Sequence, residues 1–246
     1  MNNVSRPHML GMLAGLFLAS GLVLSAMLAT TTWLKVKNSQ FITVKGSARK
    51  DIMSDLVIWR GSFTAEAPAL LDAQRKLKDD LAKVDQFLRA RGVTNFVFTP
   101  ISIGEIKASA RDDTGWTQQK TAGYRLTQTV RVESEDVERI TRLDRESTGL
   151  VEEGVLFTTQ PLEFIYTRAG EAKVEMLAEA TKDARARAEQ ISAQGGCAIA
   201  RLHSAEMGVF QITPRNEVRT SWEGMNDTSS REKTITAVVT ATFALK

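Results

Sequence analysis

The chain opens with a long apolar segment, Met9 to Leu34, that contains no formal charge. About 20 apolar residues are enough for a helix to cross the hydrocarbon core of a bilayer. Arg6 precedes the segment, and Trp33, Lys35 and Lys37 lie at or just after its end. Aromatic and cationic residues in those places are typical of the membrane–water interface. The pattern predicts a transmembrane helix over residues 9–34, with residues 1–8 as a short tail and 35–40 as a linker. Charge counting alone would favour a cytoplasmic C-terminal side, but long domains translocate largely regardless of charge, so the pattern leaves the orientation open.

A cleaved signal peptide is the alternative interpretation of this segment. Its apolar region is about 7–15 residues long and is followed by an A-x-A-like cleavage site. The run here is longer, and Ala26 and Ala29 have the wrong spacing for that site, with Met27 where a small residue is needed. We therefore favour an uncleaved signal anchor, while cleavage remains the competing possibility.

Three small residues recur at four-residue spacing within the apolar segment: Gly11, Gly15 and Ala19. Such spacing places small side chains on one helix face, where two membrane helices can approach closely. The pattern predicts a packing face for a second copy of the helix. The alternative is that glycine and alanine are simply common in membrane spans.

Beyond residue 40 the pattern changes to alternation, which predicts β-strands. The predicted strands are 41–46, 53–65, 123–132 and 234–245, with weaker ones at 95–106, 153–166 and 198–212. The last strong strand places apolar residues opposite threonines: Ile235, Ala237, Val239, Ala241, Phe243 and Leu245 share one face. We expect Pro161 to bend or split the strand that contains it.

Helical periodicity predicts three helices, at 68–91, 135–148 and 170–194. Ser134 is the expected N-cap of the second helix and Gly149 its expected end. The third helix should bury a mostly alanine face, with Val174, Leu177, Ala184, Ala188 and Ile191 directed inward. The predicted fold is therefore α+β, with antiparallel sheets and three packed helices in the order β-β-α-β-β-α-β-α-β-β. We expect one domain over residues 41–246, preceded by the transmembrane helix.

Two segments, 107–122 and 213–231, read as long loops between these elements. Loops of that length are usually functional or disordered. Each carries one tryptophan in polar surroundings, Trp116 and Trp222. Because tryptophan is enriched at interface hot spots, these residues are candidate contacts between copies of the chain. The alternatives are that each indole folds back onto its own domain, or that it contacts a ligand or lipid.

Charge distribution argues against a nucleic-acid-binding role. The chain has 32 basic and 29 acidic residues, and three of the basic ones, Arg6, Lys35 and Lys37, flank the apolar segment. The remainder is formally neutral, with 29 residues of each sign in 38–246. A phosphate-binding groove requires clustered Lys and Arg on the folded domain, and no such cluster is evident.

Residue chemistry gives little support for catalysis or cofactor binding. Cys197 is the only cysteine, and the two histidines are His8 and His203, so neither a disulfide nor a cysteine or histidine metal cage can be built within the chain. We expect Cys197 to be a small buried thiol and His203 to be a sheet-surface or hydrogen-bonded side chain. No phosphate-binding glycine motif is present. We predict no catalytic residue, no cofactor and no enzyme activity.

Four segments together carry a family resemblance. They are ITVKGSARKDIMSDLVIWRGSFTAEA at 42–67, GYRLTQTVRVESED at 123–136, EATKDARARAEQISAQGGCAIARLHSAE at 179–206 and TITAVVTATFAL at 234–245. In this order they resemble the SIMPL-domain family, the YggE-like periplasmic proteins. The first contains the family's V-x-G element, here Val44 and Gly46, and the third resembles its alanine- and arginine-rich helix. Ser47 departs from the acidic or glycine-rich turn that is common there.

The resemblance implies a tight turn after residue 46 and a domain in the periplasm, and therefore an anchor in the bacterial inner membrane with residues 1–8 as a cytoplasmic tail. It also implies self-association into a homo-oligomer, in some relatives a ring or channel-like assembly, and a loose link to envelope or oxidative stress. Our functional prediction is a membrane-anchored scaffold, cage or channel-like assembly of identical chains. Tethering to one membrane raises the local concentration, so modest interfaces can suffice. The main alternative is a periplasmic binding module for a small molecule, peptide or envelope protein; a hydrolase is a third possibility.

Overall fold

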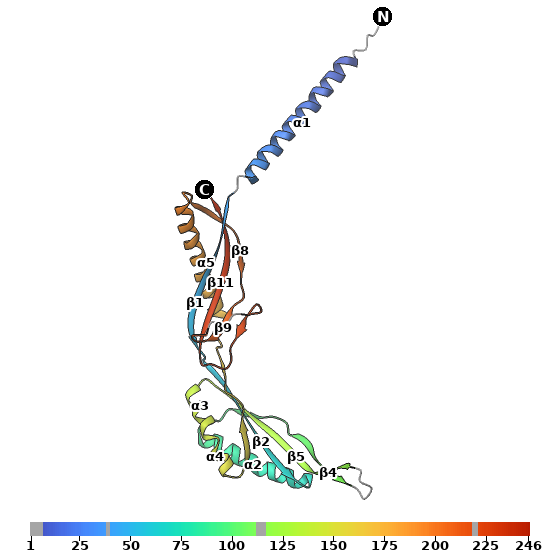
Figure 1. Cartoon of the computed structure of the whole chain (residues 1–246), viewed down its shortest axis with the longest axis vertical. Helices are drawn as coiled ribbons and strands as arrows, with labels where there is room; N and C mark the ends of the chain where they lie inside the picture. The colour runs from blue at the N-terminus through green and yellow to red at the C-terminus, as the bar shows by residue number, and fades with distance from the viewer. Residues whose placement is uncertain (1–6, 38–39, 112–116, 218–220) are drawn as a thin grey trace. The chain divides into compact units, whose positions relative to one another are not determined.

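The computed structural model describes residues 7–37, 40–111, 117–217 and 221–246 (Figure 1). The helices are α1 (Pro7–Lys37), α2 (Leu70–Ala90), α3 (Val137–Glu146), α4 (Gly149–Glu152) and α5 (Ala169–Gln194). The strands are β1 (Phe41–Met53), β2 (Leu56–Ala67), β3 (Phe96–Phe98), β4 (Ser102–Arg111), β5 (Thr117–Ser134), β6 (Leu156–Thr159), β7 (Glu163–Ile165), β8 (Ile199–Met207), β9 (Gln211–Pro214), β10 (Met225–Asn226) and β11 (Glu232–Leu245). The predicted mixed α+β class is confirmed.

The chain forms two compact units, neither of which is continuous in sequence. Unit 1 contains Met1–Ser47, Glu179–Gly208 and Val238–Lys246, and unit 2 contains Ala48–Ala178 and Val209–Ala237. Strands β1 and β11 and helix α5 each contribute residues to both units. Sequence periodicity could not show this division, because three of its four boundaries lie within β1, α5 and β11 rather than at linkers.

Unit 2 is built on a sheet with the strand order β3-β5-β2-β6, in which β4 also pairs with β5 and β7 with β2. The predicted inward face of β2 is confirmed, since Val57, Trp59, Phe63 and Ala65 are all fully buried. These residues form one core with the apolar faces of α2, α3 and α4. The opposite face of the sheet is polar and is tied by cross-strand bonds, such as Ser62–Thr129 at 2.8 Å.

Unit 1 is a thin layer in which one helix covers part of one sheet. Strand β11 pairs with β1 and, antiparallel, with β8. The buried core contains mostly small side chains: Val44, Ala184, Ala188, Ala241 and Phe243. The alternating apolar face of β11 is therefore confirmed, and it packs on the alanine face of α5.

Gly46 permits the close approach of β1 to α5. A Cβ atom at this position would lie 2.1 Å from the carbonyl oxygen of Ala180 and 2.3 Å from the main-chain nitrogen of Ala184. Both distances are far below van der Waals contact, and both atoms belong to the helix backbone. The glycine of the V-x-G element is thus required by helix–sheet packing. It does not form a turn.

Several local predictions are corrected by the structure. The turn expected after residue 46 is absent, because β1 continues to Met53 and β2 begins only at Leu56. The N-cap of α3 is Asp136 rather than Ser134: its carboxylate accepts a hydrogen bond from the main-chain nitrogen of Arg139 at 3.0 Å. Gly149 does not end this helix but begins α4. The split at Pro161 is confirmed, since β6 and β7 lie on either side of it.

The buried face of α5 differs from the predicted one. Val174 and Ile191 are 69% and 57% exposed, so they do not face inward. The buried residues recur every fourth position instead: Ala172, Met176, Ala180, Ala184, Ala188 and Ser192. The alanine character was predicted correctly. The larger side chains were wrongly assigned to the core because hydrophobicity alone does not show how closely a helix approaches its sheet.

Candidate functional site

The small-residue face of α1 is exposed in the described chain. A Cβ atom added at Gly11 or Gly15 would meet nothing within 4 Å, and Ala19 lies one turn further along an exposed helix. The stretch Gly11–Leu34 has a mean hydropathy of 2.1 and is long and apolar enough to cross a membrane. Its hydroxyl groups bond within the helix; Ser20, for example, donates to the Phe17 carbonyl at 3.0 Å. Such bonds reduce the cost of placing a hydroxyl in hydrocarbon.

Trp222 lies on a turn of unit 2 and is 98% exposed. The alternative in which this indole folds back onto its own domain is therefore wrong. The turn itself is held by Gln211, a largely buried residue of β9. The Gln211 side chain donates to the Ser221 carbonyl at 2.7 Å and accepts from the Ser221 main-chain nitrogen at 3.3 Å. The structure thus presents Trp222 to solvent on an anchored turn, and its role as a contact remains a prediction.

The other candidate tryptophan, Trp116, lies outside the described residues. The segment around it, predicted as a loop over 107–122, contains the end of β4 and the start of β5. These strands pair from Ser102↔Thr127 to Arg111↔Thr117. The loop prediction for this segment is therefore wrong in its described part. Its polar residues show no buried face, and for that reason no strand periodicity appears in the sequence.

Strand β8 is the most exposed strand of unit 1. Every residue from Ala200 to Met207 is exposed, and among the described strands β8 pairs with β11 only. Leu202 and Met207 lie opposite Phe243 and Val239, two buried residues of β11. Directly opposed residues of antiparallel strands point to the same face. Leu202 and Met207 therefore continue the apolar face of β11, yet they are 47% and 61% exposed.

The sequence analysis did not identify β8 as a site. Its residues, IARLHSAEM, lack clean alternation, and the segment was predicted only as a weak strand. The weak alternation was the signal that was missed. A strand exposed on both faces does not need to alternate apolar and polar residues. Exposed edge strands with free main-chain groups are sites where another strand can pair.

The two residues considered for site chemistry occupy ordinary positions. His203 is exposed on β8, with its ring 4.6 Å from that of Phe41. The sheet-surface alternative is thus confirmed for His203. Cys197 is half-buried rather than buried, and its sulfur lies 3.7 Å from the Gly195 carbonyl. Within the part of the chain that the structure describes, no three His, Cys, Asp or Glu residues are grouped so that they could hold a metal ion.

Lys233, on β11, is a buried cation in unit 2 that the sequence analysis did not single out. Its ammonium group donates to the Phe164 carbonyl at 2.6 Å and to the Asp227 carbonyl. Burial lowers the pKa of Lys233, while the nearby Asp227 carboxylate opposes the shift. The lysine joins β7 and the segment after β10 to β11, which is a structural role.

Asp80, on α2, is a buried acid with one unpaired carboxylate oxygen among the described residues. It is 3% exposed, and its Oδ2 atom has no hydrogen-bond partner among the described residues. Burial raises the pKa of Asp80 above its ordinary value of 3.8, against the opposing influence of Lys83 and Lys76. The ionised carboxylate therefore destabilises the folded chain at neutral pH.

Replacing Asp80 with asparagine should stabilise the protein by about 1 kcal/mol at neutral pH, because the buried charge is removed. The folded state holds the Asp80 proton more tightly than the unfolded state does. The penalty is therefore complete above the folded pKa and disappears as the pH falls toward 3.8. Urea unfolding of the two proteins at several pH values should show a difference that shrinks on acidification. The exposed neighbour provides the control, since Asp79→Asn should change stability little; equal effects of both variants would contradict the prediction.

The fold and these surfaces define a mixed α+β protein with an apolar N-terminal helix that could anchor in a membrane. The chain belongs to the SIMPL family, whose family model, described as "Protein of unknown function (DUF541)", matches residues 42–243. The resemblance drawn from the four sequence segments is thereby confirmed. A search of the curated proteins finds no match.

Proposed function

We propose that this chain is a membrane-anchored SIMPL protein whose periplasmic region assembles with identical copies into a ring, cage or channel-like scaffold. Helix α1 supplies the anchor, and the inner membrane of a bacterium is the membrane we propose. Anchoring confines many copies to one surface and so raises their effective concentration. Weak contacts between edges then become sufficient for assembly.

The observation that carries the proposal is the uncovered strand β8. It offers nine residues of main chain along a free edge, and Leu202 and Met207 extend the buried face of β11 into solvent. Helix α5 does not bury this part of the sheet. A second copy that pairs with or packs on β8 would cover both the edge and the apolar side chains.

Replacing Leu202 and Met207 together with glutamate should weaken the assembly about tenfold or more, because charges would enter an apolar contact. The measurement is the mass of the full-length protein, extracted from the membrane fraction with mild detergent, by light scattering corrected for bound detergent. Val174→Glu is the control for a glutamate on an exposed apolar residue away from β8: it adds one charge, against two in the double variant, on α5 in unit 2.

The proposal fails if the unmodified protein has the mass of a single chain, or if the double variant assembles as well as the Val174→Glu control. The same preparation tests the location. The chain should require detergent for release from membranes, and protease added to intact spheroplasts should digest the region after residue 40. Trp222→Ala belongs in the same comparison, since an anchored, exposed indole is a second candidate contact.

A further inference from the structure

Strand β3 leaves one side of its main chain free. It pairs with β5 through Phe96↔Val132, Val97↔Arg131 and Phe98↔Val130, and no other strand pairs with it in the described chain. The next residue, Thr99, donates its main-chain N–H to the Thr129 carbonyl at 2.8 Å. Hydrogen-bonded and non-bonded pairs alternate along antiparallel strands. Val97 therefore bonds toward β5, while the N–H and C=O groups of Phe96 and Phe98 point to the free side.

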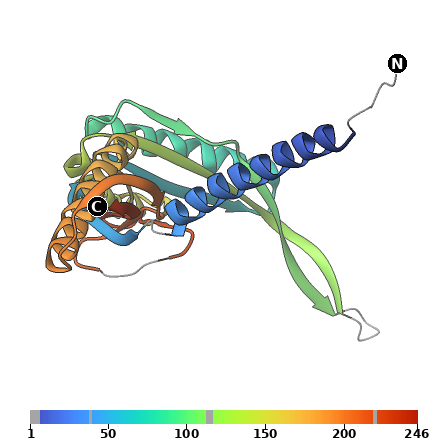
Figure 2. The same cartoon turned by 90° about the horizontal axis from the view of Figure 1, so that it is seen from above.

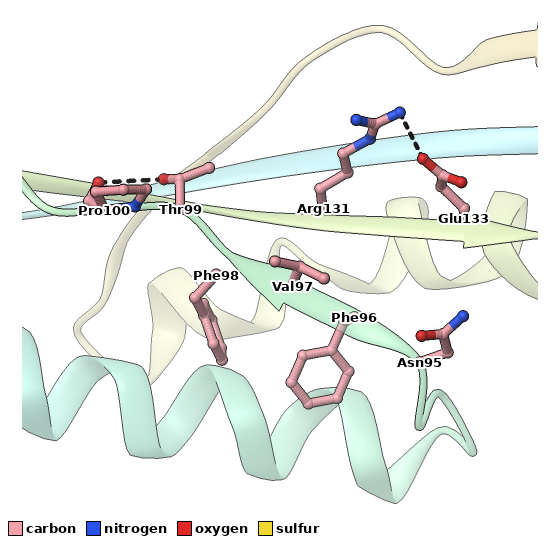
Figure 3. A pocket seen from close by; sticks show the side chains of 8 residues that line it. All are labelled: Asn95, Phe96, Val97, Phe98, Thr99, Pro100, Arg131 and Glu133. Atoms are coloured by element: carbon pink, nitrogen blue, oxygen red, sulfur yellow. Dashed lines mark hydrogen bonds and ion pairs between the residues drawn. The ribbon is translucent and has the colours of Figure 1, made fainter.

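A cavity adjoins this free edge. It has a volume of about 430 Å³ and is lined by residues 95–100 together with Arg131 and Glu133. Figure 3 shows Val97 directed to the side of the sheet that carries Arg131 and Glu133, whereas Phe96 and Phe98 point toward the opposite face. Val97 is 66% exposed. The edge thus combines unpaired main-chain groups with room for a side chain beside an apolar residue.

The aromatic side chains of β3 fix the position of the strand by their contacts with neighbouring side chains. The Phe98 ring makes an edge-on contact with the buried Phe63 at 6.1 Å, and the Phe96 ring contacts that of Phe98 at 5.5 Å. The guanidinium of Arg89 lies 5.4 Å from the centre of the Phe96 ring. An edge that is already ordered loses little conformational entropy when a strand is added to it.

In unit 2, strands β4 and β5 continue as a two-stranded ribbon beyond the end of the pairing between β5 and β2. Strand β2 pairs with β5 only as far as Ala67↔Tyr124, so residues 107–111 of β4 and 117–121 of β5 form a two-stranded arm. In Figure 2 the green ribbon extends away from the rest of unit 2. Residues 107–109 and 119–121 are all exposed. A two-stranded hairpin with no packed face is marginally stable in water.

The arm cannot reach β3 of its own chain. Strands β3 and β4 pair with the same side of β5, one after the other, at 130–132 and 117–127. The arm therefore continues the line of this edge away from β3. Only a second molecule can bring an arm to the free side of β3.

We propose that the edge of β3 receives the β5 strand of the arm, residues 117–121, from a second copy of the chain. Threonines at 117 and 121 favour an extended strand, whereas β4 of the arm contains alanine and serine. Each copy has one arm and one acceptor edge, so the contact is head-to-tail and can close a ring. This inference rests on the self-assembly proposed above and adds a defined contact in unit 2 to it.

Cysteine cross-linking of full-length protein in membranes tests the contact. In a Cys197→Ser background, one tagged copy carries Val97→Cys, and a second, differently tagged copy carries cysteine at 119, 120 or 121 in turn. Successive strand residues point to opposite faces. Strand addition predicts that disulfide yield on mild oxidation alternates along 119–121, and that it is lost when the acceptor cysteine is placed at the exposed Lys78 instead.

Two further variants measure the strength of the contact. Val97→Lys should weaken assembly about tenfold, because a charged edge residue opposes strand addition, whereas Val97→Thr should not. Replacing residues 107–122 with Asn-Gly joins Ile106 to Gly123, which are already paired, and removes the arm. Because this variant lacks the donor strand, it should assemble about as weakly as Val97→Lys, as measured by the mass of the detergent-extracted protein.

The outcomes separate the two proposals. Alternating cross-links together with loss of assembly in Val97→Lys would support the contact. An assembled particle with no cross-link, or with equal yield at 119, 120 and 121, would overturn the β3 contact and leave the scaffold proposal standing. A single-chain mass for the unmodified protein would overturn both.

Discussion

Gly46→Val is expected to lower the free energy of unfolding by about 3 kcal/mol, at the upper end of the usual cost of overpacking. The new Cβ would lie 2.1 Å from the Ala180 carbonyl oxygen and 2.3 Å from the Ala184 nitrogen. Because both are backbone atoms of α5, no side-chain rotation can relieve the overlap. The helix must move away from β1, and the small core around Val44 opens. Urea unfolding followed by circular dichroism measures the loss.

Gly104→Val is the matched control for this substitution. Gly104 is exposed on β4, and the nearest atom to an added Cβ is the Arg125 carbonyl oxygen at 3.8 Å. The control should change stability by no more than about 0.5 kcal/mol. If Gly46→Val were as mild as Gly104→Val, the close approach of β1 to α5 would not describe unit 1.

Trp59→Ala should cost about 3–5 kcal/mol of unfolding free energy, as large aromatic truncations in a packed core do. Trp59 is fully buried at the centre of unit 2. Its indole nitrogen donates to the Asp144 carboxylate at 2.8 Å, and its ring stacks on Phe157 at 5.9 Å. The substitution thus leaves a cavity and removes the link between β2 and α3. Chemical unfolding of the full chain measures the change.

Trp222→Ala supplies the control by making the same substitution at a residue that is 98% exposed. It should alter the stability of the single chain by about 0.5 kcal/mol or less. Trp59→Phe should fall between the two, because it keeps most of the packing but removes the donor to Asp144. A loss at Trp59 no greater than that at Trp222 would contradict the described core.

The strands with one buried face were predictable because burial leaves a period of two in the sequence. The apolar residues of β2 and β11 alternate with polar ones, and the structure buries the apolar set in each case. Strands without a buried face left no such record. Residues 107–109 and 119–121 of the arm and residues 200–207 of β8 are exposed, and the sequence analysis predicted these segments as loop or as weak strand.

Some candidate sites could likewise be predicted from the sequence, and others could not. The span of α1 and its small-residue face follow from composition and spacing, and Trp222 was singled out because it is a tryptophan in polar surroundings. The edges of β8 and β3 could not be found along the chain. A strand has a free edge when no other strand pairs with one of its sides. Which strands pair is decided by residues that are distant in the sequence.

The amino-acid sequence by itself determined the long apolar N-terminal helix, the α+β class and the family, because each depends on composition, periodicity or short motifs. Tertiary structure alone decided that Gly46 serves a helix contact, that alanines rather than Val174 and Ile191 line the inner face of α5, and which strands keep a free edge. These features depend on how closely distant segments approach, and distances between such segments leave no local pattern in a chain.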